Sequence, residues 1–151
     1  MTRLFLALFA TLFAFSAARA ADGMVTHACT GTAKATLDRI ETIAGARGLK
    51  IFARIDHAAG ARSIGESLQP TELLILGHPK GGTPLLQCGQ TYGLDLPLRV
   101  LAWEDAEGRC RVGYAAPDSM VARHGNPECL PIAKRLTGTL DQLVLEADSP
   151  R

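Results

Sequence analysis

The chain has 151 residues, of which 47% are hydrophobic, and its 16 basic residues nearly balance its 15 acidic ones. This length suits a single domain that buries one sizeable core. The near-neutral charge and the lack of a basic cluster argue against nucleic acid as a partner.

The first 20 residues have the pattern of a cleavable signal peptide. Arg3 makes the start positive, and residues 4–17 are apolar or small and carry no charge. Ala18 and Ala20 are small at the two positions that a signal peptidase reads, so we expect cleavage after Ala20. The alternative is an uncleaved membrane anchor, but the apolar run is shorter than the roughly 20 residues that cross a bilayer as a helix. We therefore expect a periplasmic or secreted protein without a stable membrane anchor after cleavage.

The remainder is expected to form one domain over residues 21–147, followed by a frayed tail at 148–151. No repeat, low-complexity tract or long linker divides it. Removing residues 1–20 takes away two basic residues and no acidic one, so the mature net charge is about −1.

Strand and helix patterns alternate in the first half of this domain. Residues 24–28 can form a short strand, and apolar residues recur at helical spacing over 31–47, where Gly48 can end the helix in a left-handed turn. Residues 49–56 alternate in polarity, which predicts a strand with one covered face. That face carries Leu49, Ile51, Ala53 and Ile55.

The second half begins with a short turn over 58–65 and an apolar strand over 71–76. Thr83-Pro84 pairs a hydroxyl cap with proline at the first helical position, which predicts a helix to about Tyr92. Strands at 98–104 and 109–114 flank a loop that contains Gly108, as in an antiparallel pair. A helical stripe closes the domain and consists of Ile132, Leu136, Leu140 and Leu143.

This order, β-α-β-(α)-β-α-β-β-α, predicts an α+β fold. The layers form a single two-layer α/β sandwich with a mixed sheet of about five strands.

Four cysteines, Cys29, Cys88, Cys110 and Cys129, lie in the expected exported part, and an even number in an oxidising compartment favours two disulfides. Free buried thiols and a metal site are the alternatives, although no Cys-x-x-Cys pair is present. Spacing alone leaves all three complete pairings open. Cys110 shares a strand face with Val112, and the helix bearing Cys88 could cover that face, so we favour Cys88–Cys110 with Cys29–Cys129.

Three segments together resemble the bacterial family called domain of unknown function 302. They are LKIFARIDHAAGA at 49–61, LQPTELLILGHPKGGTPLLQ at 68–87 and LDLPLRVLAWED at 94–105. Residues 108–114 and 123–125 fit the same pattern, so the resemblance covers roughly residues 24–145. It implies a compact α/β sandwich that is often a homodimer, and it implies no particular activity.

The cysteines depart from the pattern of that family. Cys88, Cys110 and Cys129 stand where relatives commonly have other residues, whereas some relatives have cysteines at the positions of His78 and Leu98. A thiol role in those relatives is therefore not transferred to this chain, and we interpret its own cysteines as an adaptation to export.

Polar residues at two predicted strand ends are the candidate ligand-binding residues. Asp56 and His57 end one strand, and His78 and Lys80 follow the next, so neighbouring strands could bring all four to one rim. A histidine beside a carboxylate can transfer protons, but Asp56 could equally cap the turn that follows. The run from Lys80 to Pro84 could hold an anion ahead of a helix, yet it lacks the spacing of a phosphate-binding loop.

No catalytic set, metal site or cofactor emerges from these residues. We expect a non-catalytic exported binding or accessory domain that binds an unknown small ligand and can form a homodimer. One alternative is an enzyme or small-molecule-binding protein that uses the rim of Asp56, His57, His78 and Lys80. The other is a protein that handles thiols or metals through its cysteines.

Overall fold

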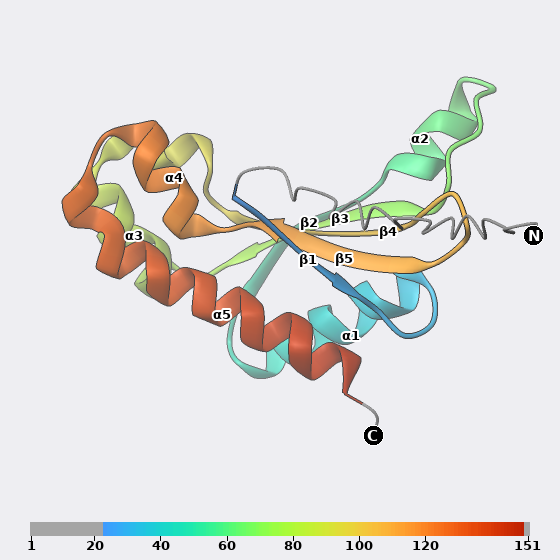
Figure 1. The fold of residues 1–151 in the computed structure, drawn as a ribbon, viewed down its shortest axis with the longest axis horizontal. Helices are drawn as coiled ribbons and strands as arrows, with labels where there is room; N and C mark the ends of the chain where they lie inside the picture. The colour runs from blue at the N-terminus through green and yellow to red at the C-terminus, as the bar shows by residue number, and fades with distance from the viewer. Residues whose placement is uncertain (1–22, 150–151) are drawn as a thin grey trace, which may run out of the picture.

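The computed structural model describes residues 23–149, so the predicted signal peptide lies outside the described residues. Figure 1 shows an open sheet with helices along one face and at both ends. The strands are β1 (Met24–Ala28), β2 (Lys50–Asp56), β3 (Thr71–Gly77), β4 (Leu98–Glu104) and β5 (Cys110–Ala115). The helices are α1 (Ala33–Ala46), α2 (His57–Ser63), α3 (Pro79–Cys88), α4 (Pro117–His124) and α5 (Leu130–Asp148), with short 3-10 helices η1 (Gln90–Leu94) and η2 (Pro127–Cys129).

The five strands pair in the order β1-β5-β4-β3-β2, and every neighbouring pair is antiparallel. The α+β sandwich predicted from the sequence is confirmed, but the sheet is not mixed. A parallel neighbour needs a connection that crosses back over the sheet, whereas α2 and α3 lie at its two ends. Each of β3, β4 and β5 therefore pairs antiparallel with the strand that precedes it in the chain, whereas α1 crosses the sheet between the two edge strands, β1 and β2.

One face of the sheet is covered by α1 and α5, and the hydrophobic core lies between these layers (Figure 1). Thr32 caps α1 by accepting a hydrogen bond from the Ala35 N–H at 3.1 Å, as the helical pattern predicts. The largest fully buried side chains include Leu37, Ile40, Leu74, Leu76, Val100, Val112, Leu140 and Leu143.

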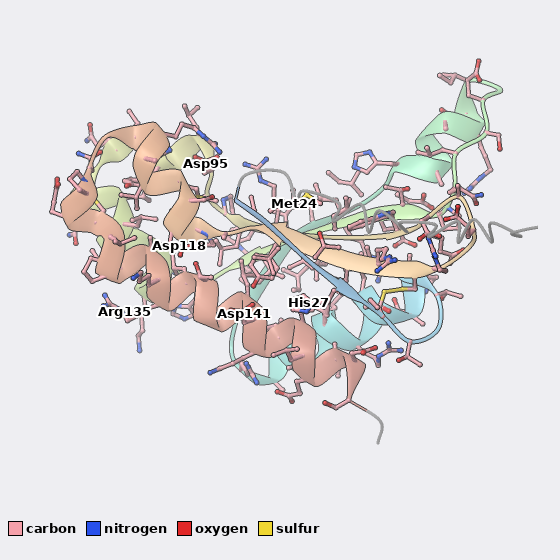
Figure 2. The ribbon with its side chains drawn as sticks, in the orientation of Figure 1. Met24, His27, Asp95, Asp118, Arg135 and Asp141 are labelled. Atoms are coloured by element: carbon pink, nitrogen blue, oxygen red, sulfur yellow. A yellow bond between two sulfur atoms is a disulfide. The ribbon has the colours of Figure 1, made fainter. Side chains whose placement is uncertain are left out.

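Successive side chains along each strand point alternately to this covered face and to the opposite face of the sheet. In Figure 2, His27 lies on the α5 side of β1 and Met24 on the other side. Tyr114 also faces α5, because its hydroxyl donates a hydrogen bond to the Asp141 carboxylate of that helix. Burial and this anionic partner raise the pKa of Tyr114, so it remains a hydrogen-bond donor that ties β5 to α5.

Strand β2 does not keep one apolar face from end to end. A β-bulge between Ile51 and Ala53 shifts the register with β3, so Ile51 packs on the core while Ile55 is exposed. The bulge also places Arg54 opposite Leu74, on the covered face. The predicted alternation is therefore wrong beyond Ile51, because an extra residue reverses the faces.

Arg54 uses this placement to join β2 to α1 and β3. Its guanidinium donates hydrogen bonds to Glu72 at 2.7 Å and to Asp38 at 2.5 Å. Burial of the guanidinium opposes its charge, but these two carboxylates outweigh it and raise the pKa of Arg54.

The C-terminal part differs from the prediction in two ways. Helix α4 was not predicted, although Pro117 at its first turn and the left-handed Gly125 at its end are ordinary helix signals. The frayed tail does not begin at 148, because Asp148 is the last residue of α5 and accepts a hydrogen bond from the Thr30 N–H at 2.6 Å.

All four cysteines are paired, but the favoured pairing is wrong. The disulfides are Cys29–Cys110, with Cα atoms 5.1 Å apart, and Cys88–Cys129, at 5.9 Å. The register of β1 on β5 decides the first, since the Cys29 N–H already donates to the Cys110 carbonyl at 3.1 Å. The second joins the end of α3 to the start of α5, a contact that no local pattern encodes.

The β4–β5 loop is organised by the Asp105 carboxylate, which accepts hydrogen bonds from the Glu107 and Arg109 N–H groups and from the Arg109 guanidinium. Desolvation alone would raise the pKa of Asp105, but these bonds and the Arg109 charge outweigh it and lower the pKa to about 2. At pH values above the ordinary pKa of 3.8, the negative charge on Asp105 therefore stabilises the folded state. This stabilisation is lost as the pH falls through about 2.

Asp105→Asn should consequently lower the melting temperature at pH 5 to 7. Asparagine can still accept the backbone hydrogen bonds but cannot carry the charge. The difference between variant and wild type should shrink between pH 4 and pH 2, as thermal unfolding across that range will show. A difference independent of pH would mean that charge plays no part in this loop.

Among residues 23–149, no helix is both long enough and apolar enough to span a membrane.

Candidate functional site

A cavity of about 770 Å³ lies between one end of the sheet, α3 and α5. Its walls come from the turn before β2, the Phe52 bulge, the end of β3, the first turns of α3, the segment leading into β4 and the middle of α5. This volume lies within the range of about 300 to 1,000 Å³ typical of small-molecule sites.

The cavity walls are mainly apolar. Leu86, Leu96 and Leu136 contribute aliphatic side chains, and Phe52 contributes an aromatic ring. Glycine lets α3 approach α5 closely, because a Cβ at Gly81 would lie only 3.2 Å from the Leu136 Cδ2 atom. The mouth is marked by His78 and Lys80, which are exposed to solvent.

Helix α3 begins earlier than predicted, so the Lys80–Pro84 segment lies within the helix and does not precede it. His78 is the N-cap and its Nδ1 accepts a hydrogen bond from the Lys80 N–H at 3.0 Å. Pro79 takes the first helical position, and Pro84 lies inside the helix. The two glycines are therefore part of the helix, and their N–H groups already donate to the His78 carbonyl at 2.9 and 3.1 Å.

The predicted rim of four residues does not exist as one site. His78 and Lys80 line the cavity, whereas Asp56 is opposite Glu72, at the other end of the β2–β3 pair. An antiparallel pair sets the end of one strand beside the start of the next, which separates the two ends. Asp56 instead caps α2 by accepting from the Ala59 N–H at 2.7 Å, and His57 is an exposed residue of that helix.

A polar cluster around the His124 side chain lies outside the cavity lining, and it was not predicted, although Arg123-His124-Gly125 was noted as family-like. The His124 ring bonds to the Asp95 carboxylate at 2.6 Å and to the Thr91 hydroxyl at 2.8 Å, and it packs on Tyr92. Because the His124 side chain is only 5% exposed, this arrangement serves to tie α4 to η1 and the loop before β4. Figure 2 shows Asp95 beside α4.

Cys88 and Cys129 lie beside a third side chain of a type that binds metal ions. Cys88, Cys129 and the Glu128 carboxylate place their ligand atoms within 4.8 Å of one another. Both sulfurs are joined in a disulfide in this structure, and metal binding by cysteine uses the thiolate. A metal at this place would therefore require reduction first.

The fold and cavity define an α+β sandwich with a small-molecule-sized apolar site. The model of the family described as "Domain of unknown function DUF302" matches residues 25–147, and the chain belongs to this family. This confirms the resemblance read from the sequence.

Two kinds of relative accompany this family membership. A solved DUF302 protein from Bacillus stearothermophilus is 17% identical, with a TM-score of 0.77 over 85% of this chain and 100% of its own. Proteins named fluoride-specific ion channels from Brucella suis and Brucella abortus are 40% identical over 120 residues, or 78% of this chain. The match spans 47% and 44% of these two proteins, so it covers less than half of their length.

Proposed function

We propose that this protein is a non-catalytic binding domain whose ligand occupies the cavity between α3 and α5. The volume of about 770 Å³ and the mainly apolar walls are the observations that carry the proposal. The competing enzymatic reading depended on Asp56 and His57 acting together with His78 and Lys80, and the antiparallel strands separate these two pairs.

The fluoride-channel relatives do not supply the ligand. They match this chain over less than half of their length, so conduction of fluoride is not carried over. Apolar walls are also a poor environment for a small, strongly hydrated anion, because they offer few groups to replace its water. An organic ligand with an apolar body suits this cavity better.

We further propose that the domain works outside the cytoplasm, as the signal-peptide pattern indicates. Two disulfides support this location, since they form and persist mainly in oxidising compartments. Protein recovered from the periplasm should begin at Ala21, which intact mass will show together with the state of the cysteines; retention of residues 1–20 on cytoplasmic protein would contradict export.

Binding can be tested with Nile red, a neutral dye that fluoresces in apolar surroundings. The wild-type protein should bind it saturably. Thr139→Trp should weaken this binding at least about tenfold, because Thr139 lines the cavity from α5 and an indole there would occupy the space of the dye. Fluorescence titration measures the change.

The matched control is Leu145→Trp, which adds the same side chain at a position of α5 that is 56% exposed and does not line the cavity. It should bind the dye like the wild type, and thermal unfolding should show both variants folded. Equal dye binding by all three proteins would refute the cavity as the binding site.

A further inference from the structure

The charged side chains of the cavity are all of one sign. Arg47 and Lys80 line it together with His78, and no carboxylate from residues 23–149 does so. A third cation lies close by, since the Lys50 ammonium is 5.1 Å from the centre of the Phe52 ring that forms part of the wall. A ligand that combines an apolar body with a negative charge would match both features.

These basic groups differ in whether they are free to pair with a ligand. The Arg47 guanidinium is already paired with the Glu146 carboxylate of α5. The His78 Nδ1 is engaged in capping α3. Neither Lys80 nor Lys50 has an ion-pair partner among residues 23–149. The Lys50 ammonium lies over the Phe52 ring, however, and only Lys80 lines the cavity, where it is exposed to solvent.

The arrangement of apolar and charged groups also sets the orientation of a bound ligand. Among the lining residues, Leu136 is buried and Leu86 and Leu96 are half-buried, whereas Lys80 is exposed. An apolar chain placed inside would therefore bring its head to the ammonium, where water can still reach both charges. This avoids the large cost of burying an ion without a partner.

We propose that the cavity binds a single-chain organic anion, with its hydrocarbon body between α3 and α5 and its acidic head at Lys80. This deepens the proposed binding function and rests on it. The hydrocarbon part supplies affinity through burial of apolar surface, and Lys80 selects the anionic head through a charge-assisted hydrogen bond.

The test displaces Nile red with dodecanoate, dodecyl phosphate, dodecanol and dodecyltrimethylammonium, all below the concentrations at which they form micelles. The two anions should displace the dye at concentrations about tenfold lower than dodecanol, and the cation should be weakest. A preference for dodecanoate over dodecyl phosphate identifies a carboxylate ligand, and the reverse identifies a phosphate monoester. Octanoate should bind several-fold more weakly than dodecanoate, because it buries fewer methylene groups.

Lys80→Gln should remove most of the preference for the anions while leaving dodecanol binding unchanged. Lys134→Gln, which removes the same charge from an exposed position of α5 outside the cavity, should leave the preference intact. Equal binding of acid and alcohol by a wild-type protein that still binds Nile red would overturn the anion proposal alone. An anion preference that survives in Lys80→Gln would overturn the role of Lys80, and failure to bind Nile red would overturn the proposed function itself.

Discussion

Replacing Cys29 and Cys110 together by alanine should lower the free energy of unfolding by about 2 to 4 kcal/mol. The disulfide joins residues 81 apart in sequence, so it removes many conformations from the unfolded chain. Cys88–Cys129, with a separation of 41, should contribute about half a kcal/mol less by the same reasoning. Alanine is preferred to serine because Cys110 and Cys129 are buried, and alanine adds no polar group to the interior.

Urea denaturation of the wild type and of the two double variants, with and without reductant, measures these contributions. Reductant should destabilise the wild type more than either variant, since each variant has one bridge left to lose. Peptide mapping without reduction should find Cys29 linked to Cys110. A peptide linking Cys88 to Cys110, or four thiols that can be alkylated in protein taken from the periplasm, would contradict the structure.

Gly113→Ala should destabilise the protein by about 1 to 3 kcal/mol, the usual cost of overpacking. A Cβ at Gly113 would lie 2.7 Å from the Val25 carbonyl oxygen, which is a backbone atom of the adjacent strand. The same Cβ would lie 3.4 Å from the Trp103 ring. Strand β1 would have to move away from β5, although alanine in itself is better tolerated than glycine inside a strand.

Gly138→Ala is the matched control, because it makes the same chemical change within α5 where a Cβ would meet nothing within 4 Å. Alanine should stabilise that helix by about 0.5 to 1 kcal/mol, so the two variants should change stability in opposite directions. Chemical denaturation gives the sign. Emission from Trp103, the single tryptophan, should shift only in Gly113→Ala. A neutral or stabilising Gly113→Ala would show that β1 does not pair with β5 in this register.

Prediction from sequence succeeded where neighbouring residues hold the information. The strand at 98–104 has the predicted bounds, and α1 is shorter than predicted by only a few residues at its ends. It failed at the start of α3, because the segment contains two pairs of a capping residue followed by proline. Thr83-Pro84 was predicted as the helix start, whereas the helix begins at His78-Pro79.

For the candidate site, sequence reasoning named His78 and Lys80, which line the cavity, but grouped them with Asp56 and His57, which do not. Asp56 and His57 are close to them only if the strands run parallel, and direction is a property of the whole sheet. The apolar wall contributed by Thr139 and Leu136 was not predicted as part of a site, since it comes from a helix far along the chain.

The sequence by itself determined the α+β class, the family, the positions of most elements and the presence of cysteines able to form two bridges. These depend on periodicity, caps and spaced motifs, which act over a few residues. Only the tertiary structure decided the antiparallel order, the bulge in β2, the cysteine partners and the cavity. Each of these features depends on contacts between segments that are distant in sequence. Burial of a shared core determines those contacts, and local preferences do not.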